Sequence, residues 1–174
     1  MSYAPMWFQL NYKSRITNPK SNGMKKYYSL LILLLVLISC TLTGDQEKKL
    51  NESLSAYLFS RNECRLVNYV AFSYPDIVIA YKSQGDSAFQ RAFDCNIDSL
   101  YLENPTMRQT VKENSEIHVE YDLDAYHKAT NEELEEKHKL VAISSDNGKS
   151  WFFIDQENYF NTKLLPKLKR LLKK

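Results

Sequence analysis

The chain is poor in glycine, histidine and cysteine, the residues on which many short functional motifs depend. Its 174 residues include four glycines, three histidines and three cysteines. The glycines are too scattered for a phosphate-binding loop, the histidines lack the tight spacing of a metal site, and no Gly-x-Ser-x-Gly segment of a hydrolase is present. The sequence therefore indicates no cofactor and no metal ligand, and no motif assigns a catalytic residue.

Long apolar runs are also scarce. A helix that spans a bilayer needs about 20 apolar residues, whereas the longest run here is Leu30–Ile38. The run follows Lys25 and Lys26 and ends close to Cys40. A short positive segment before a core of roughly 7–15 apolar residues is typical of a secretion signal. The alternative is an uncleaved anchor helix.

The end of this run, Leu37-Ile38-Ser39-Cys40, resembles the lipobox of bacterial lipoproteins. The resemblance implies cleavage before Cys40, a lipid on its sulfur and attachment to a membrane of the cell envelope, where two or three acyl chains anchor stably. Thr41 follows the cysteine, and in the enterobacterial pattern this favours the outer membrane. We expect a mis-assigned extension at 1–23, a signal peptide at 24–39, a lipidated linker at 40–46 and a single domain at 47–174.

Charge is distributed unevenly along the chain. All 21 acidic residues but only 18 of the 23 basic ones follow Cys40, so the expected mature chain carries a net charge of −3. Six basic residues lie within 163–174, and the remaining body has 12 basic against 21 acidic residues, a net charge of −9. An acidic body argues against nucleic-acid binding, which needs a basic face. The basic end is compatible with contact to anionic lipid.

Cys64 and Cys95 are the remaining cysteines of the expected mature chain. In an oxidising envelope they can form a disulfide. The alternative is that both thiols are buried and pack as small hydrophobic groups.

Apolar periodicity predicts that helices come first in the domain. A stripe of helical spacing, formed by Leu50, Leu54, Tyr57 and Leu58, predicts a helix from Glu47 to about Ser60. Shorter helices are expected over 66–72, from Pro75 onward, and from about 88 to 95 with Asp86 or Ser87 as its cap. The segment 77–81 is apolar all round, which predicts that it is buried.

A period of two predicts that strands follow. We expect strands over 97–103, 107–111, 117–126, 139–145 and 151–155, with turns at Asn104-Pro105 and over 112–115. The clearest strand is 117–126, because apolar residues on one face alternate with charged residues on the other.

The segment Ser144-Ser145-Asp146-Asn147-Gly148-Lys149-Ser150-Trp151 predicts a tight hairpin. Asn147-Gly148 tolerates positive φ at both central positions, and Ser144 and Asp146 can accept backbone N–H bonds. The segment resembles the Asp-box of sialidases, in which Ser144, Asp146, Gly148 and Trp151 would have structural roles. A single box cannot indicate a propeller, which needs several blades.

Leucines and basic residues alternate at helical spacing near the C-terminal end. We expect an amphipathic helix over Lys163–Lys174, with Pro166 in its first turn and five leucines on one face. This helix either packs on the domain with its lysines in solvent or contacts an anionic membrane surface.

Helices followed by antiparallel hairpins predict an α+β fold with helices on one face of a curved sheet. The order of elements, and the run Leu140–Asp155 in particular, resembles the cone of nuclear-transport-factor-like (SnoaL-like) proteins. A cystatin-like sheet is the alternative.

The resemblance to the cone implies a pocket between sheet and helices, in which some relatives place an acid–base pair. His118 and Asp122 share one face of the strand 117–126, so they are the candidate pair if that face lines the pocket. If the face meets water, they are ordinary surface residues. His127 and His138 flank a turn near Glu135 and Glu136, but their spacing is not that of a metal site.

Three functions remain open from the sequence. The first is a non-catalytic envelope lipoprotein that binds a protein, a lipid or a small ligand. The second is a SnoaL-like enzyme that uses His118 and Asp122. The third is a membrane-interface protein that contacts anionic lipid through its basic C-terminal helix.

Overall fold

The computed structural model describes residues 41–94 and 100–173, and these all belong to one compact unit, Leu37–Lys174. The predictions for the N-terminal extension, the signal peptide, Cys40 and Cys95 therefore concern residues outside the described ranges. Within those ranges, no helix is long and apolar enough to cross a membrane.

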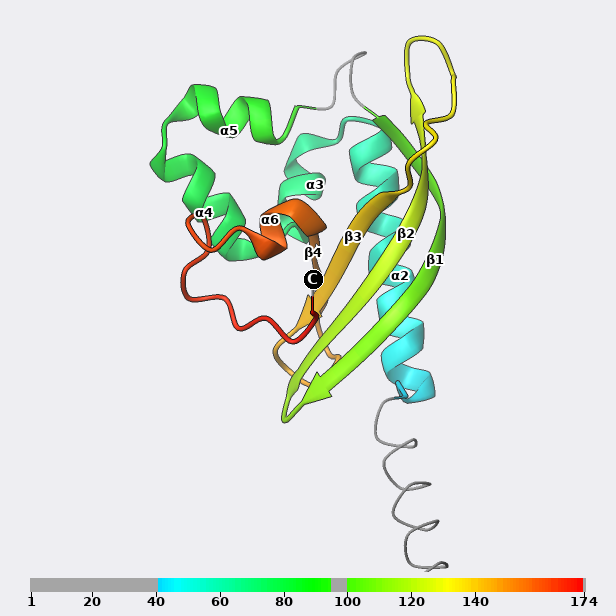
Figure 1. Cartoon of the computed structure of the whole chain (residues 1–174), viewed down its shortest axis with the longest axis vertical. Coiled ribbons are helices and arrows are strands. Elements are labelled where there is room, and N and C mark those ends of the chain that lie inside the picture. Colours follow the sequence, from blue (N-terminus) through cyan, green and yellow to red (C-terminus); the bar gives the residue numbers. More distant parts are fainter. Residues whose placement is uncertain (1–40, 95–99, 174) are drawn as a thin grey trace, which may run out of the picture. The chain divides into compact units, whose positions relative to one another are not determined.

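Four antiparallel strands form an open sheet in the order β1-β2-β3-β4 (Figure 1). The strands are β1 (Leu100–Glu113), β2 (Glu116–His127), β3 (His138–Ser144) and β4 (Phe152–Asp155). Each strand pairs with the next one along the chain, so the sheet is a meander. The sheet and its helices confirm the predicted α+β class.

Among the described residues, four helices precede the sheet and one short helix follows it. They are α2 (Gly44–Asn62), α3 (Leu66–Phe72), α4 (Pro75–Ser83), α5 (Asp86–Ala92) and α6 (Gln156–Phe160). The predicted stripe on α2 is correct, because its four residues are all buried. α5 begins after Gly85, which gives no side-chain cap, so the predicted cap at Asp86 or Ser87 is wrong.

α2 begins earlier than predicted. Residues 44–46, expected to be part of a linker, form its first turn, because Thr43 and Gln46 make a capping box in which each side chain bonds the other's backbone N–H. The Gln46 amide also donates to the carbonyl oxygen of Asn147 at 2.8 Å. The start of α2 is thus attached to the turn between β3 and β4.

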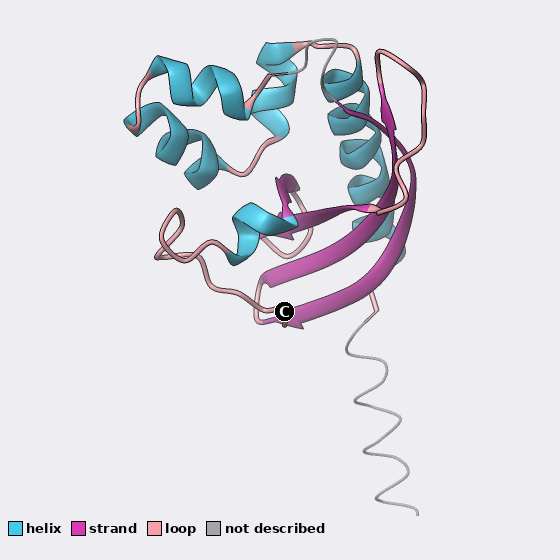
Figure 2. Cartoon of the chain, turned by 45° about the horizontal axis from the view of Figure 1, so that its top comes forward, coloured by secondary structure: helices cyan, strands magenta, loops and turns pink. Residues whose placement is uncertain are grey.

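The sheet has two covered faces, which we call the α2 face and the C-terminal face (Figure 2). The α2 face carries every second residue of β2, namely Ile117, Val119, Tyr121, Leu123 and Ala125, all buried. Phe153 of β4 shares this face through its pairing with Ala142, and its ring stacks on Tyr57 of α2 at a centroid distance of 4.8 Å.

The C-terminal face carries the intervening residues and is covered by α6 and the segment after it. His118 and Glu120 of β2 lie on this face, where they contact Tyr159 and Gln156 of α6. Three leucines of the following segment, Leu165, Leu168 and Leu172, are buried.

The C-terminal amphipathic helix predicted over Lys163–Lys174 is wrong for the described residues. After α6, the segment 161–173 forms turns and bends. Pro166 has no N–H to give to a helix, and the Arg170 side chain donates to the carbonyl oxygens of Tyr159, Asn161, Leu165 and Leu168. The leucines are buried, as they would be in a packed helix, but the backbone that carries them is irregular.

Two further predictions are wrong. Asn104-Pro105 does not turn the chain, because β1 runs through it with irregular register on both sides of Thr106–Met107 and with Asn104 at a φ of 50°. A β-bulge of this kind accommodates an extra residue without ending the strand. The segment 77–81 is not buried all round, since Ile77 is buried whereas Ile79 is 64% exposed.

Candidate functional site

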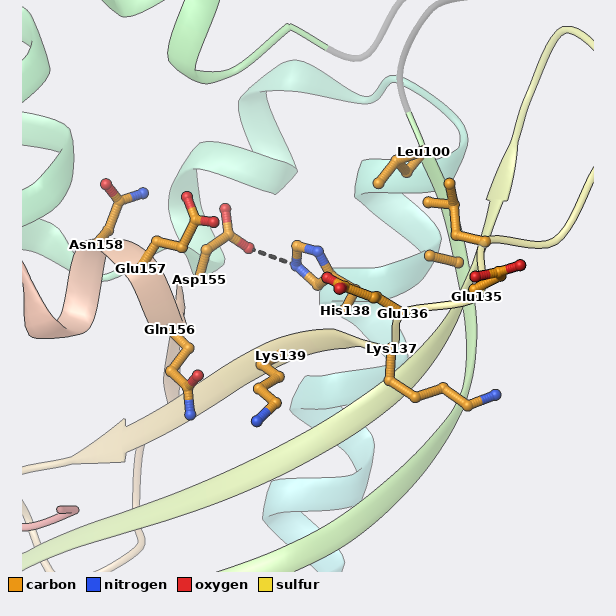
Figure 3. A pocket seen from close by; sticks show the side chains of 12 residues that line it. Leu100, Glu135, Glu136, Lys137, His138, Lys139, Asp155, Gln156, Glu157 and Asn158 are labelled. Carbon is orange, nitrogen blue, oxygen red and sulfur yellow. Dashed lines mark hydrogen bonds and ion pairs between the residues drawn. The ribbon is translucent and has the colours of Figure 1, made fainter. Parts of the chain in front are cut away.

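An open cleft of about 840 Å³ lies where the ends of β3 and β4 meet the start of α6 (Figure 3). Its lining comes from β1, β2 and the loop before β3 as well. The residues that line it are Leu100, Ala125, Leu134, Glu135, Glu136, Lys137, His138, Lys139, Asp155, Gln156, Glu157 and Asn158. Apolar side chains form one part of the wall, and charged or amide side chains form the rest.

A cluster of three interacting side chains lies at this cleft. His138 Nε2 lies 2.8 Å from Asp155 Oδ1, and Arg61 of α2 places its guanidinium 3.5 Å from the same oxygen and 3.3 Å from the imidazole nitrogen. The three side chains are largely buried, with exposed fractions of 15% for Arg61, 18% for His138 and 30% for Asp155. His138 and Asp155 face the cleft, and Arg61 supports them from α2.

The cluster keeps Asp155 ionised. Burial alone would raise the pKa of Asp155, but the charge of Arg61 and the hydrogen bond from His138 outweigh it and hold the pKa at about 2. Burial lowers the pKa of Arg61, but Asp155 and then Tyr57 outweigh it, so the pKa of the guanidinium is raised. The cleft therefore contains a fixed carboxylate with a charged partner behind it.

The register of the sheet brings the cluster together. Leu140 pairs with Asp155 and Leu123 pairs with His138, so His138 and Asp155 lie on the α2 face, two residues apart along the ladder. No pattern in the sequence had indicated this site. A signal existed in the Asn147-Gly148 turn, because its position fixes the β3–β4 pairing that sets Asp155 opposite Leu140. Nothing in the sequence pointed to Arg61.

His118 and Asp122, the predicted acid–base candidates, have different partners. His118 is fully buried, with Nδ1 2.7 Å from the Tyr159 hydroxyl and Nε2 3.3 Å from Glu116 Oε1. Asp122 instead pairs with Arg108 at 3.2 Å. Four residues separate the two along β2, a distance of about 13 Å at 3.3 Å per residue, and neither residue lines the cleft. The structure does not bring them together.

The hairpin residues form one connected turn. Ser144 donates its hydroxyl hydrogen to Asp146 and accepts the N–H of Gly148, while Asp146 accepts the N–H groups of Lys149 and Ser150. Burial would raise the pKa of Asp146, but these hydrogen bonds hold it at about 2. Trp151 is buried.

Gly148 is required by its surroundings. Its φ is +82°, and an added Cβ would lie 2.6 Å from the Cγ of Gln46, so a larger residue would be strained and would have to displace the Gln46 side chain.

The other predicted sites lie elsewhere. Cys64 is exposed, and its predicted disulfide partner Cys95 lies outside the described residues, so that bridge stays a prediction. Cys40, the predicted lipidation site, lies outside them as well. His127, at the end of β2, pairs with Leu100 and is not part of the cluster at His138.

Comparisons with known proteins add no relative: no family model, no curated protein and no solved structure matches this chain. The resemblances to bacterial lipoproteins, to the Asp-box and to SnoaL-like proteins therefore stay predictions that rest on the quoted residues.

Proposed function

We propose that this chain is a membrane-tethered, non-catalytic domain that binds a small ligand in the cleft at His138 and Asp155. The observation that carries the proposal is the cleft itself: about 840 Å³, within the range of ligand sites, with an apolar wall and a few polar groups in fixed positions. Arg61 holds Asp155 and His138 in place before any ligand binds, and such preorganisation favours affinity.

The arrangement we propose for the fold is cone-like rather than cystatin-like. Two features support it: several helices precede the sheet, and the cleft opens on the side of the sheet where Arg61 of α2 meets His138 and Asp155. A pocket between sheet and helices is what the resemblance to SnoaL-like proteins implies.

Nuclear magnetic resonance on the full chain in detergent micelles tests ligand binding. A panel of neutral, anionic and cationic aromatic fragments is titrated, and we expect at least one class to shift resonances of His138, Leu134 and Asn158. Leu134→Trp would fill the cleft and abolish these shifts. The matched control is Val67→Trp on α3, because Val67 is 83% exposed and outside the cleft. If no fragment shifts these resonances, the proposal is wrong.

The tether rests on the lipobox resemblance. Intact mass spectrometry of protein extracted from membranes should give the mass of residues 40–174 plus acyl chains, and Cys40→Ser should abolish the modification. A gain of about 2 Da on reduction would report a disulfide, since opening a bridge adds two hydrogens. An unmodified mass that retains the apolar run would instead indicate an uncleaved anchor and exclude the lipidated tether.

Contact of the C-terminal segment with anionic lipid is the second candidate. Lys163, Lys167 and Lys173 are exposed on this segment, whereas Leu165, Leu168 and Leu172 are buried against the sheet. The contact we propose is therefore electrostatic and without insertion of the leucines, so it should be lost at high salt.

A further inference from the structure

The rim of the cleft carries carboxylates that no neighbouring cation neutralises. Glu135, Glu136 and Glu157 all line the cleft, and none of them forms an ion pair with another residue in the described part of the chain. Unpaired carboxylates around a concave surface concentrate cations there, because low-dielectric walls focus the field. The charge of the rim therefore selects among ligands.

The three rim carboxylates outnumber the one lysine of the cleft, Lys139, that forms no ion pair among the described residues. Lys137 is engaged elsewhere, since its Nζ lies 2.6 Å from Asp124 Oδ1 and 3.3 Å from Glu133 Oε1, and neither carboxylate lines the cleft. The side chains of Lys137 and Lys139 extend away from the His138–Asp155 pair (Figure 3). A ligand that approaches the His138–Asp155 pair therefore passes acidic side chains.

Asp155 has one oxygen left for a ligand. Its contacts with Arg61 and His138 both use Oδ1, and Oδ2 makes no hydrogen bond to another of the described residues. The side chain stays 30% exposed. A carboxylate oxygen that only accepts hydrogen bonds needs a donor, and an ammonium group brings three.

The opposite part of the wall is apolar. Leu100, Ala125 and Leu134 line it, and Leu100 and Leu134 are half-buried, so each has surface that an apolar group can cover. Burying such surface contributes about 25 cal/mol per Å². A ligand that fits both parts of the wall has an apolar body and a positively charged head.

We propose that the cleft binds a small organic cation, an amine with an apolar body, whose ammonium group donates to Asp155 Oδ2. The proposal rests on the proposed function and adds the chemical class of the ligand. A metal ion suits the cleft less well, because no three His, Cys, Asp or Glu side chains of residues 41–94 and 100–173 are placed to hold one.

Isothermal titration of the full chain in micelles with three probes of similar shape tests this inference. The probes are phenethylamine, the neutral phenethyl alcohol and the anionic phenylpropionate. We expect the amine to bind at least 10-fold more tightly than the alcohol and the acid not to bind. Binding of the amine should weaken as salt is raised, because the rim carboxylates are exposed to solvent.

A double variant of the rim tests its carboxylates without disturbing the cluster, since Asp155→Asn would leave Arg61 without its charged partner. The double variant Glu136→Gln/Glu157→Gln should weaken amine binding about 5-fold or more, because each exposed charge adds a modest attraction and two of them are removed. The matched control is Glu52→Gln, which removes an exposed carboxylate of α2 outside the cleft and should leave binding unchanged.

The possible outcomes separate this inference from the proposed function. If the alcohol or the acid binds as tightly as the amine, the cleft is a ligand site but not a cation site, and only this inference fails. If Glu52→Gln weakens binding as much as the rim variants do, the attraction is general to the acidic body and the inference fails too. If none of the probes binds and the fragment panel also leaves the cleft unchanged, both proposals are wrong.

Discussion

Both faces of the sheet contain fully buried residues, yet they are covered by different kinds of structure. Val119 and His118 are successive residues of β2 on opposite faces, and both are fully buried. One regular helix of 19 residues, α2, covers the α2 face. Five residues of α6 and an irregular segment cover the C-terminal face. Burial therefore does not require a regular element.

What differs between the faces is where the covering backbone finds its hydrogen bonds. In α2 the helix itself pairs N–H with C=O. In the C-terminal segment few backbone groups pair with each other, as Leu165 N–H does with Asn161, and side chains pair with others. Arg170 donates to four carbonyl oxygens, and the Tyr159 hydroxyl accepts the N–H of Leu172. Buried backbone groups must be paired, so an irregular cover depends on a few polar side chains, whereas a helical cover does not.

Substitution of Leu50 by alanine should have the largest effect, because it removes apolar contacts from the centre of the α2 face. Leu50 is fully buried, and truncation of such a leucine costs about 2–5 kcal/mol. Urea denaturation of the full chain in micelles measures this loss. Val67→Ala, at a residue that is 83% exposed, should change the free energy of unfolding by less than about 0.5 kcal/mol. Equal effects of the two substitutions would contradict the packing described for this face.

Substitution of Arg170 by methionine should have a smaller and more local effect. Methionine keeps an apolar stem but no donors, so four carbonyl oxygens lose the Arg170 donor, and only those of Asn161 and Leu165 keep a backbone N–H. We expect a loss of about 1–3 kcal/mol. Hydrogen exchange should speed up over residues 161–173 and stay unchanged in α2. Lys167→Met is the control in the same segment, because Lys167 is exposed and forms no ion pair with another described residue. Faster exchange in α2 as well would show that the two faces do not open separately.

The elements of the α2 face could be predicted from the sequence because the spacing of their apolar residues indicates a helix and a strand. The stripe of Leu50, Leu54 and Tyr57 has the period of a helix, and β2 alternates with the period of a strand. The Asn147-Gly148 turn gave the β3–β4 hairpin. These signals are local, so each element could be recognised without knowing its neighbours.

The C-terminal face could not be predicted in the same way. Leu165, Leu168 and Leu172 have helical spacing, but the chain that holds them is irregular, because Arg170 and Pro166 override the periodicity. The alternation in β2 indicated two surfaces but not whether the charged surface is covered, so it left open whether His118 is buried. The site was missed for a related reason: Arg61 meets His138 and Asp155 only through tertiary contacts between segments far apart in the sequence.

The charged groups around His118 make the C-terminal face sensitive to pH. Burial lowers the pKa of His118, Glu116 opposes this effect and Lys169 adds to it. Tyr159, the other group in contact with the imidazole, has a pKa raised by burial and so stays neutral near pH 7. The α2 face places no histidine among its fully buried residues. Of the described residues that are fully buried, His118 is thus the one whose charge can change as the solution becomes mildly acidic.

Substitution of His118 by asparagine should therefore change how stability depends on pH. Because the pKa of His118 is lower in the folded chain than its ordinary value of about 6.5, the unfolded chain binds more protons between the two values. The free energy of unfolding should then fall as the pH falls below about 6.5, by no more than about 1.4 kcal/mol per pH unit for one group.

Urea denaturation of the unsubstituted chain and of His118→Asn between pH 5 and 8 measures how the free energy of unfolding depends on pH. Asp146 and Asp155 do not interfere, because their pKa values of about 2 confine their effect to more acidic solutions. His118→Asn should flatten the slope whatever it does to the stability at pH 8, and His127→Asn, at an exposed histidine, should not. If His118→Asn leaves the slope unchanged, the imidazole already meets water in the folded chain. The irregular cover would then exclude water less well than α2 does, and the two faces would differ in protection as well as in structure.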